Sequence, residues 1–128
     1  MTELVSQVDP PGISANSAFA QGMIAPAGRM VYVGGQNGTD RSGELLKGIG
    51  AQTEQALRNV LAVLAEAGTG PENVVKLTVY LDPSVDPRDG YAATATVWGN
   101  RRTAVTVLAV APARSGALVE IDAIAAIP

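Results

Sequence analysis

The sequence contains neither cysteine nor histidine. Without cysteine there is no disulfide bond and no thiol nucleophile, and without histidine there is no Ser-His-Asp triad. Both residue types are also the usual ligands of zinc, so the common zinc sites are excluded. We therefore expect a functional site that holds no metal ion.

Basic residues and long hydrophobic runs are also scarce. The 9 lysines and arginines stand against 12 aspartates and glutamates, giving a net charge of −3. General binders of nucleic acid or anionic membranes usually carry a basic excess. No apolar run reaches the ~18 residues of a membrane span, and the start, Met1-Thr2-Glu3-Leu4, has no features of a secretory signal. These features predict a cytoplasmic protein without a nucleic-acid or membrane partner.

Aromatic residues make up only 4% of the chain, although 47% of it is hydrophobic. The apolar residues are mostly Ala, Val, Leu and Ile, and small side chains bury little area each. A length of 128 residues suits one domain, 1–128. A small, apolar and lightly charged chain of this kind favours oligomerisation that covers part of its surface.

The hydrophobic pattern predicts an α+β domain with the order ββαβαββ. The expected strands are 18–25, 30–33, 73–81, 103–110 and 117–125, and the expected helices are 49–67 and 87–98. The first dozen residues are expected to be an extended lead-in, and Asn37-Gly38 a tight turn with positive φ. Two helices should cover one face of a mixed sheet. The other face is partly apolar yet carries Glu120 and Asp122, and we expect it to meet another subunit.

Three features of the pattern could carry chemistry, and each has an ordinary structural explanation. Glu120 interrupts an apolar strand and is either a solvated carboxylate or a group in a cleft that takes a proton. Arg102, beside Arg101, is either surface or a two-pronged binder of carboxylate or phosphate. Gly34 and Gly35 follow a strand and form either a plain turn or a place where backbone N–H groups meet an anion.

Three segments together resemble the Rid family, also called the YjgF/YER057c/UK114 family, whose archetype is an enamine/imine deaminase. The resemblance runs from about Ala18 to Ala126. The similar segments are 31–36 (VYVGGQ), 52–60 with 67–68 and 74–81, and 102–105 (RTAV) with 119–125 (VEIDAIA). The resemblance implies a chorismate-mutase-like fold and a homotrimer with ligand clefts between subunits. It also implies hydrolysis of 2-aminoacrylate-type imino and enamino acids to keto acids and ammonia, without a cofactor.

The resemblance also implies roles for individual residues. Arg102 matches the arginine that binds the substrate carboxylate, and Gly35, after Gly34, matches the backbone N–H that helps to hold it. Glu120 matches the carboxylate near the attacking water. A planar 2-imino acid needs both a cation for its carboxylate and a water held over its imine carbon, so this combination is chemically coherent.

Three substrate-pocket positions depart from the family pattern. Phe19 replaces a tyrosine, Ala104 replaces a cysteine, and Tyr91 aligns with an asparagine. The leading hypothesis is a 2-imino/enamino acid deaminase. The alternatives are a non-catalytic binder or regulator that uses the same cleft for 2-keto acids, and a ribonuclease or translation inhibitor. The sequence pI near 4.8 and the missing histidine argue against a ribonuclease.

Overall fold

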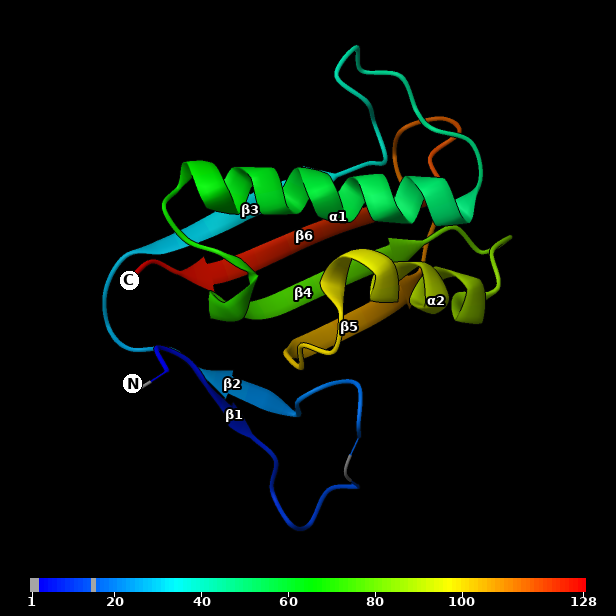
Figure 1. Ribbon diagram of the computed structural model, residues 1–128. Coiled ribbons are helices and arrows are strands. Elements are labelled where there is room, and N and C mark those ends of the chain that lie inside the picture. The colour runs from blue at the N-terminus through cyan, green and yellow to red at the C-terminus, as the bar shows by residue number, and fades with distance from the viewer. Residues whose placement is uncertain (1–2, 15) are drawn as a thin grey trace.

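The computed structural model describes residues 3–14 and 16–128. Figure 1 labels its strands and its two α-helices. In chain order the elements are β1 (Ser6–Val8), β2 (Gly22–Ile24), β3 (Met30–Gln36), α1 (Ile49–Glu66), the short 3-10 helix η1 (Pro71–Asn73), β4 (Val74–Leu81), α2 (Pro87–Trp98), β5 (Ala104–Ala109) and β6 (Val119–Ala126). Within the described residues, no helix is both long and apolar enough to cross a membrane.

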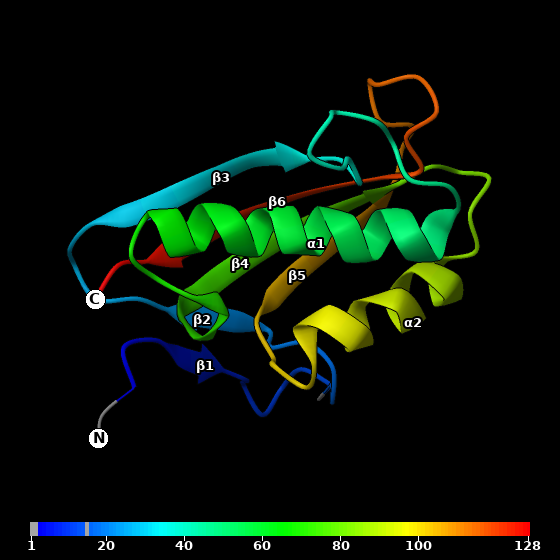
Figure 2. The ribbon, with the colours of Figure 1, turned by 45° about the horizontal axis from the view of Figure 1, so that its top comes forward.

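The main sheet has four strands in the order β3-β6-β4-β5. Strand β6 is antiparallel to both of its neighbours, whereas β4 and β5 are parallel and are joined through α2. Figures 1 and 2 show α1 and α2 lying over the same face of this sheet. The expected architecture, a mixed sheet covered on one face by two helices, is therefore confirmed.

The core lies between α1 and the sheet, and strand β6 forms its floor. Val119, Ile121, Ala123 and Ala125 are all buried, whereas the residues between them are only partly buried. Helix α1 packs onto this face with an apolar stripe that includes Leu57, Val60 and Leu64. The helix ends before Gly68, which takes a φ of +87° as expected of a residue that stops a helix.

The predicted strand over 18–25 is wrong at its first half. Only Gly22–Ile24 is a strand, and it pairs with β1 rather than joining the main sheet. The Asn16 side chain accepts hydrogen bonds from the N–H groups of Ala18 and Phe19, and this local turn competes with strand pairing. Ala20 forms only an isolated bridge with Ala104. The expected extended lead-in thus contains the paired strand β1, and its first two residues lie outside the described residues.

We name residues 3–14 and 16–24 the N-terminal arm. It contains β1 and β2 and lies beyond the β5 edge of the sheet (Figure 1). Val5 and Ala20 are its buried apolar residues. The N–H of Ala20 donates to the carbonyl of Thr103 at 3.0 Å, which joins the arm to the start of β5.

The predicted positive φ at Gly38 is also wrong, and a close approach explains the glycine instead. Gly38 is absent from the glycines with positive φ. A Cβ at this position would overlap the backbone of Gln52 in α1. Gln52 is buried, and its Nε2 donates to the carbonyls of Leu46 and Gly116 while its Oε1 accepts from the N–H of Leu118. The helix and two loops therefore meet at this one glutamine.

We predict that Gly38→Ala lowers the free energy of unfolding by about 1–3 kcal/mol, because the α1 backbone cannot move aside without repacking. Gly50 is the matched control, since it lies in α1 and a Cβ added there would extend into open space. Gly50→Ala should leave stability unchanged or raise it by up to about 1 kcal/mol, because alanine favours the helix. Urea unfolding of both variants checks this, and equal stability of the two would contradict the close approach.

Candidate functional site

The residues singled out in the sequence fall into two clusters. The arginine cluster comprises Phe19, Tyr91, Arg102 and Ala104, near the start of β5. The glutamate cluster comprises Gly34, Gly35 and Glu120, where β3 meets β6. Tyr80 of β4 is paired with Leu108 of β5 on one side and with Glu120 of β6 on the other. Glu120 therefore lies at the level of Leu108, which is six residues beyond Arg102 in the chain. At about 3.3 Å per residue, the two clusters lie roughly 20 Å apart along the sheet of one chain.

Arg102 lies just before β5, where two neighbours hold the backbone. The hydroxyl of Thr103, which is buried, donates to the carbonyl of Val74 at 2.9 Å. Ala104 pairs with Lys76 on one side and forms the bridge to Ala20 on the other. The guanidinium that precedes this anchored segment is therefore positioned by both the sheet and the N-terminal arm.

The guanidinium of Arg102 binds the carboxylate of Asp9 through two parallel contacts. Nη1 donates to Asp9 Oδ2 and Nη2 to Asp9 Oδ1, each at 3.2 Å. Nη1 also donates to Gln7 Oε1 at 2.7 Å, and Nη2 donates to the carbonyls of Asn16 and Phe19 at 2.8 and 2.9 Å. The arginine expected to bind a ligand carboxylate thus already holds one from its own chain.

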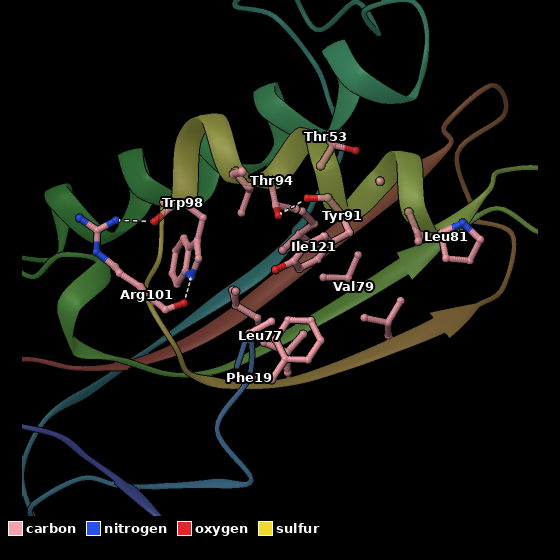
Figure 3. Close-up of a pocket in the computed structure, with 18 residues that line it drawn as sticks. Phe19, Thr53, Leu77, Val79, Leu81, Tyr91, Thr94, Trp98, Arg101 and Ile121 are labelled. Carbon is pink, nitrogen blue, oxygen red and sulfur yellow. Dashed lines mark hydrogen bonds between the residues drawn. The ribbon is translucent and has the colours of Figure 1, made fainter. Parts of the chain in front are cut away.

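The surroundings of Asp9 favour its ionised form. The hydrogen bond from Arg102, together with the one from the N–H of Gln21, lowers the pKa of the Asp9 carboxyl. Asp9 is therefore ionised at neutral pH. Arg101 has a different role, because its Nη1 donates to the carbonyl of Trp98 and its guanidinium lies over the Trp98 ring (Figure 3). Of the two adjacent arginines, Arg102 is the one that contacts a carboxylate.

Phe19 and Tyr91 meet beside an apolar cavity. Their ring centroids are 6.0 Å apart in an edge-to-face arrangement, which is favourable for aromatic pairs. The cavity has a volume of about 90 Å³ and lies between α2 and the strands β4 and β5. Figure 3 shows Leu77, Val79 and Ile121 among its lining residues. The structure therefore brings Phe19 and Tyr91 together, and the carbonyl of Phe19 links both to Arg102.

The glutamate cluster is built on an irregularity of strand β3. Val33 pairs with Ala123, whereas Gln36 pairs with Ile121, so β3 contains one residue more than β6 over this interval. Gly34 and Gly35 occupy the interruption, as expected of a β-bulge. A Cβ on Gly35 would overlap the carboxylate of Glu120, whereas one on Gly34 would meet open space. Glycine at position 35 therefore allows Glu120 to lie against the β3 backbone.

Glu120 is partly buried on the face of the sheet opposite the helices. Nδ2 of Asn37 donates to Glu120 Oε1 at 3.5 Å and to the carbonyl of Val119 at 3.2 Å. The carbonyl of Asn37 in turn accepts from Asn59 of α1. On the same face, Tyr80 donates to Asp122, and this hydrogen bond raises the pKa of the Tyr80 phenol. Glu120 is thus oriented by Asn37 and left with lone pairs for another partner.

Sequence reasoning missed Asp9, Gln7 and Asn37, although each contacts a candidate residue. Asp9 belongs to the segment expected to be an extended lead-in, and its partner Arg102 lies 93 positions away. No local spacing reports such a contact. Among the described residues, no group of three or more Asp or Glu side chains is arranged to hold a metal ion.

Comparison with known proteins identifies the family. The family model described as endoribonuclease L-PSP matches residues 11–127. A RutC family protein of Pyrococcus horikoshii is 36% identical over 101 residues, covering 77% of this chain and 80% of that protein. A 2-iminobutanoate/2-iminopropanoate deaminase of Rattus norvegicus is 34% identical over 114 residues, covering 88% of this chain and 82% of that protein.

A solved structure agrees with these matches. The Yersinia pestis protein YyfB, described as a member of the conserved Rid protein family with unknown function, superposes with a TM-score of 0.85 at 28% identity. The match covers 97% of this chain and 99% of that one. The family model, the similar sequences and the solved structure all agree, and the chain belongs to the Rid family.

Proposed function

We propose that the chain hydrolyses reactive 2-imino and enamino acids of the 2-aminoacrylate type to 2-keto acids and ammonia. The observation that carries the proposal is the two-pronged contact between Arg102 and the Asp9 carboxylate. This contact places a carboxylate where the proposed substrate carboxylate would bind. The rat relative named as an imino-acid deaminase supports the same chemistry.

The proposed reaction needs little beyond positioning. Water adds to the imine carbon, and Glu120 accepts a proton from that water and returns it to the nitrogen. Glu120 next accepts the hydroxyl proton of the resulting carbinolamine and passes it to the nitrogen, so that the C–N bond breaks, ammonia leaves and the carbonyl of the keto acid forms. An imine is already electrophilic, so a held carboxylate, a placed water and one acid–base group are sufficient in kind.

Arg102 and Glu120 must come from two copies of the chain in this proposal. Within one chain they lie roughly 20 Å apart along the sheet, which is too far for both to touch one small substrate. The uncovered face carries exposed Tyr32 and Leu108 beside partly buried Glu120. We propose that this face meets its copies in a homotrimer, and that each cleft combines one copy's arginine cluster with its neighbour's glutamate cluster.

Phe19, Tyr91 and Ala104 define the proposed substrate range. None of the three is an acidic or basic residue, and Phe19 offers an apolar ring. We propose that they line the side-chain end of the substrate pocket. A pocket of this kind favours apolar imino acids over those with charged side chains.

We predict different losses for two substitutions. Glu120→Gln should slow imine hydrolysis by at least about 100-fold, because it removes the acid–base group, but it should keep pyruvate binding. Arg102→Ala should lose both, because the carboxylate contact is gone. The measurement generates imines with an amino-acid oxidase and catalase and follows their diversion from a semicarbazide trap, with pyruvate binding measured separately by calorimetry.

The controls separate chemistry from folding. Gly50→Ala, which places a methyl group in open space, should hydrolyse imines as the wild type does. Urea unfolding must show that Glu120→Gln is folded. If the wild type binds pyruvate but diverts no imine from any amino acid tested, the chain is a non-catalytic keto-acid binder and the proposed reaction is rejected.

The shared cleft gives a second prediction. When Arg102→Ala and Glu120→Gln chains are refolded together in equal amounts, some clefts regain one intact arginine and one intact glutamate. Random assembly restores about a quarter of the clefts, so about a quarter of wild-type activity should return. A site contained in a single chain would recover no activity on mixing.

A further inference from the structure

The contact between Asp9 and Arg102 has features of a replaceable contact. Its two distances are 3.2 Å, longer than the 2.7–2.9 Å of the neutral partners Gln7, Asn16 and Phe19. Charge-assisted hydrogen bonds are normally the shorter ones. The one charged partner is thus the most loosely held of those that surround this guanidinium.

Solvent reaches the pair, and the rest of the site does not depend on Asp9. The side chains of Arg102 and Asp9 retain 25% and 32% of their exposure. The backbone carbonyls of Asn16 and Phe19 continue to orient Nη2 when the carboxylate leaves. Nε of Arg102 is buried without a hydrogen-bond partner among the described residues. An arginine with only a structural role would be expected to have a hydrogen-bond acceptor for its Nε as well.

We propose that Asp9 is an internal competitor for the carboxylate-binding position of Arg102 and therefore determines how tightly the site holds its ligands. The proposal rests on the proposed function in that it assigns Arg102 to a carboxylate ligand. In the free protein the Asp9 carboxylate fills the fork of the guanidinium. A ligand carboxylate enters by displacing it, and Asp9 returns when the product leaves.

This arrangement sets a threshold for ligand binding, because Asp9 lowers the apparent affinity for every carboxylate ligand by the same factor. A bare small carboxylate must replace a contact that the chain already makes, so it gains little net binding. A ligand that also contacts the apolar wall at Phe19 gains additional binding free energy and displaces Asp9 more readily. Simple carboxylate anions of the solvent therefore leave Asp9 in place at concentrations at which a 2-imino or 2-keto acid with an apolar side chain, through its contact with Phe19, displaces it.

We predict that Asp9→Asn binds pyruvate about 3–10-fold more tightly than the wild type, because the competing population is reduced. The KM for imino acids should fall by a similar factor, while kcat stays within about twofold. Asparagine keeps the size of the side chain and an oxygen for the N–H of Gln21. Glu66→Gln, an exposed position at the end of α1, removes the same charge elsewhere and should change neither value.

A measurement on the wild type avoids any effect of the substitution on folding. The N–H of Gln21 donates to Asp9 Oδ1 at 3.1 Å. Saturating pyruvate should therefore speed hydrogen exchange at the Gln21 amide and shift its NMR signal. Unchanged or slower exchange in the pyruvate-bound protein would overturn the proposal. So would a weaker affinity of Asp9→Asn for pyruvate, which would mean that Asp9 only positions Arg102.

The outcomes distinguish this proposal from the proposed function. If Asp9→Asn binds pyruvate more tightly but the wild type hydrolyses no imine, the role of Asp9 as a competitor is supported and the deaminase function is rejected. If the wild type hydrolyses imines and the KM of Asp9→Asn is unchanged or raised, the deaminase function is supported and the role of Asp9 as a competitor is rejected. If neither the wild type nor Asp9→Asn binds pyruvate, the role of Asp9 as a competitor is rejected directly.

Discussion

Strand β6 buries every second residue under the helices, and the positions of the candidate residues follow from that alternation. Val119, Ile121 and Ala123 face the core, so Glu120 and Asp122 must face the opposite side. A shift of one residue in register would bury the carboxylates and expose the apolar set. Because β6 lies between β3 and β4, this register also brings Glu120 against the bulge of β3. The packing of the core thus determines which face of the sheet carries the acid.

The same sheet keeps the two clusters apart within one chain. The arginine cluster lies at the start of an edge strand, where it depends on the N-terminal arm for support. The glutamate cluster lies further along the sheet, where it depends on α1 through Asn59 and Asn37. Each cluster can therefore be stabilised by its own surroundings without the other. A ligand held at both would join two copies of the chain and would report on their assembly.

The parts of the fold predicted from sequence are those with strong periodicity. The stripe of α1 and the alternation of β6 each depend on local burial, and both are confirmed. The failures arise from contacts between residues distant in sequence. Strand β1 exists because residues 6–8 pair with 22–24, and Gly38 is a glycine because α1 lies against it. Arg102 could be selected from its sequence context, but its occupation by Asp9 depends on how the arm folds back.

The buried amide of Gln52 has a chemical consequence for the end of the sheet at which β6 begins. It supplies two donors to the carbonyls of Leu46 and Gly116 and one acceptor to the N–H of Leu118. Deamidation to glutamate would place a carboxylate oxygen against those two carbonyls, turning two attractive contacts into repulsive ones. The loop before α1 and the loop before β6 would then loosen together. Hydrolysis of this one amide would in this way loosen the structure near Glu120 without altering any residue of the candidate site.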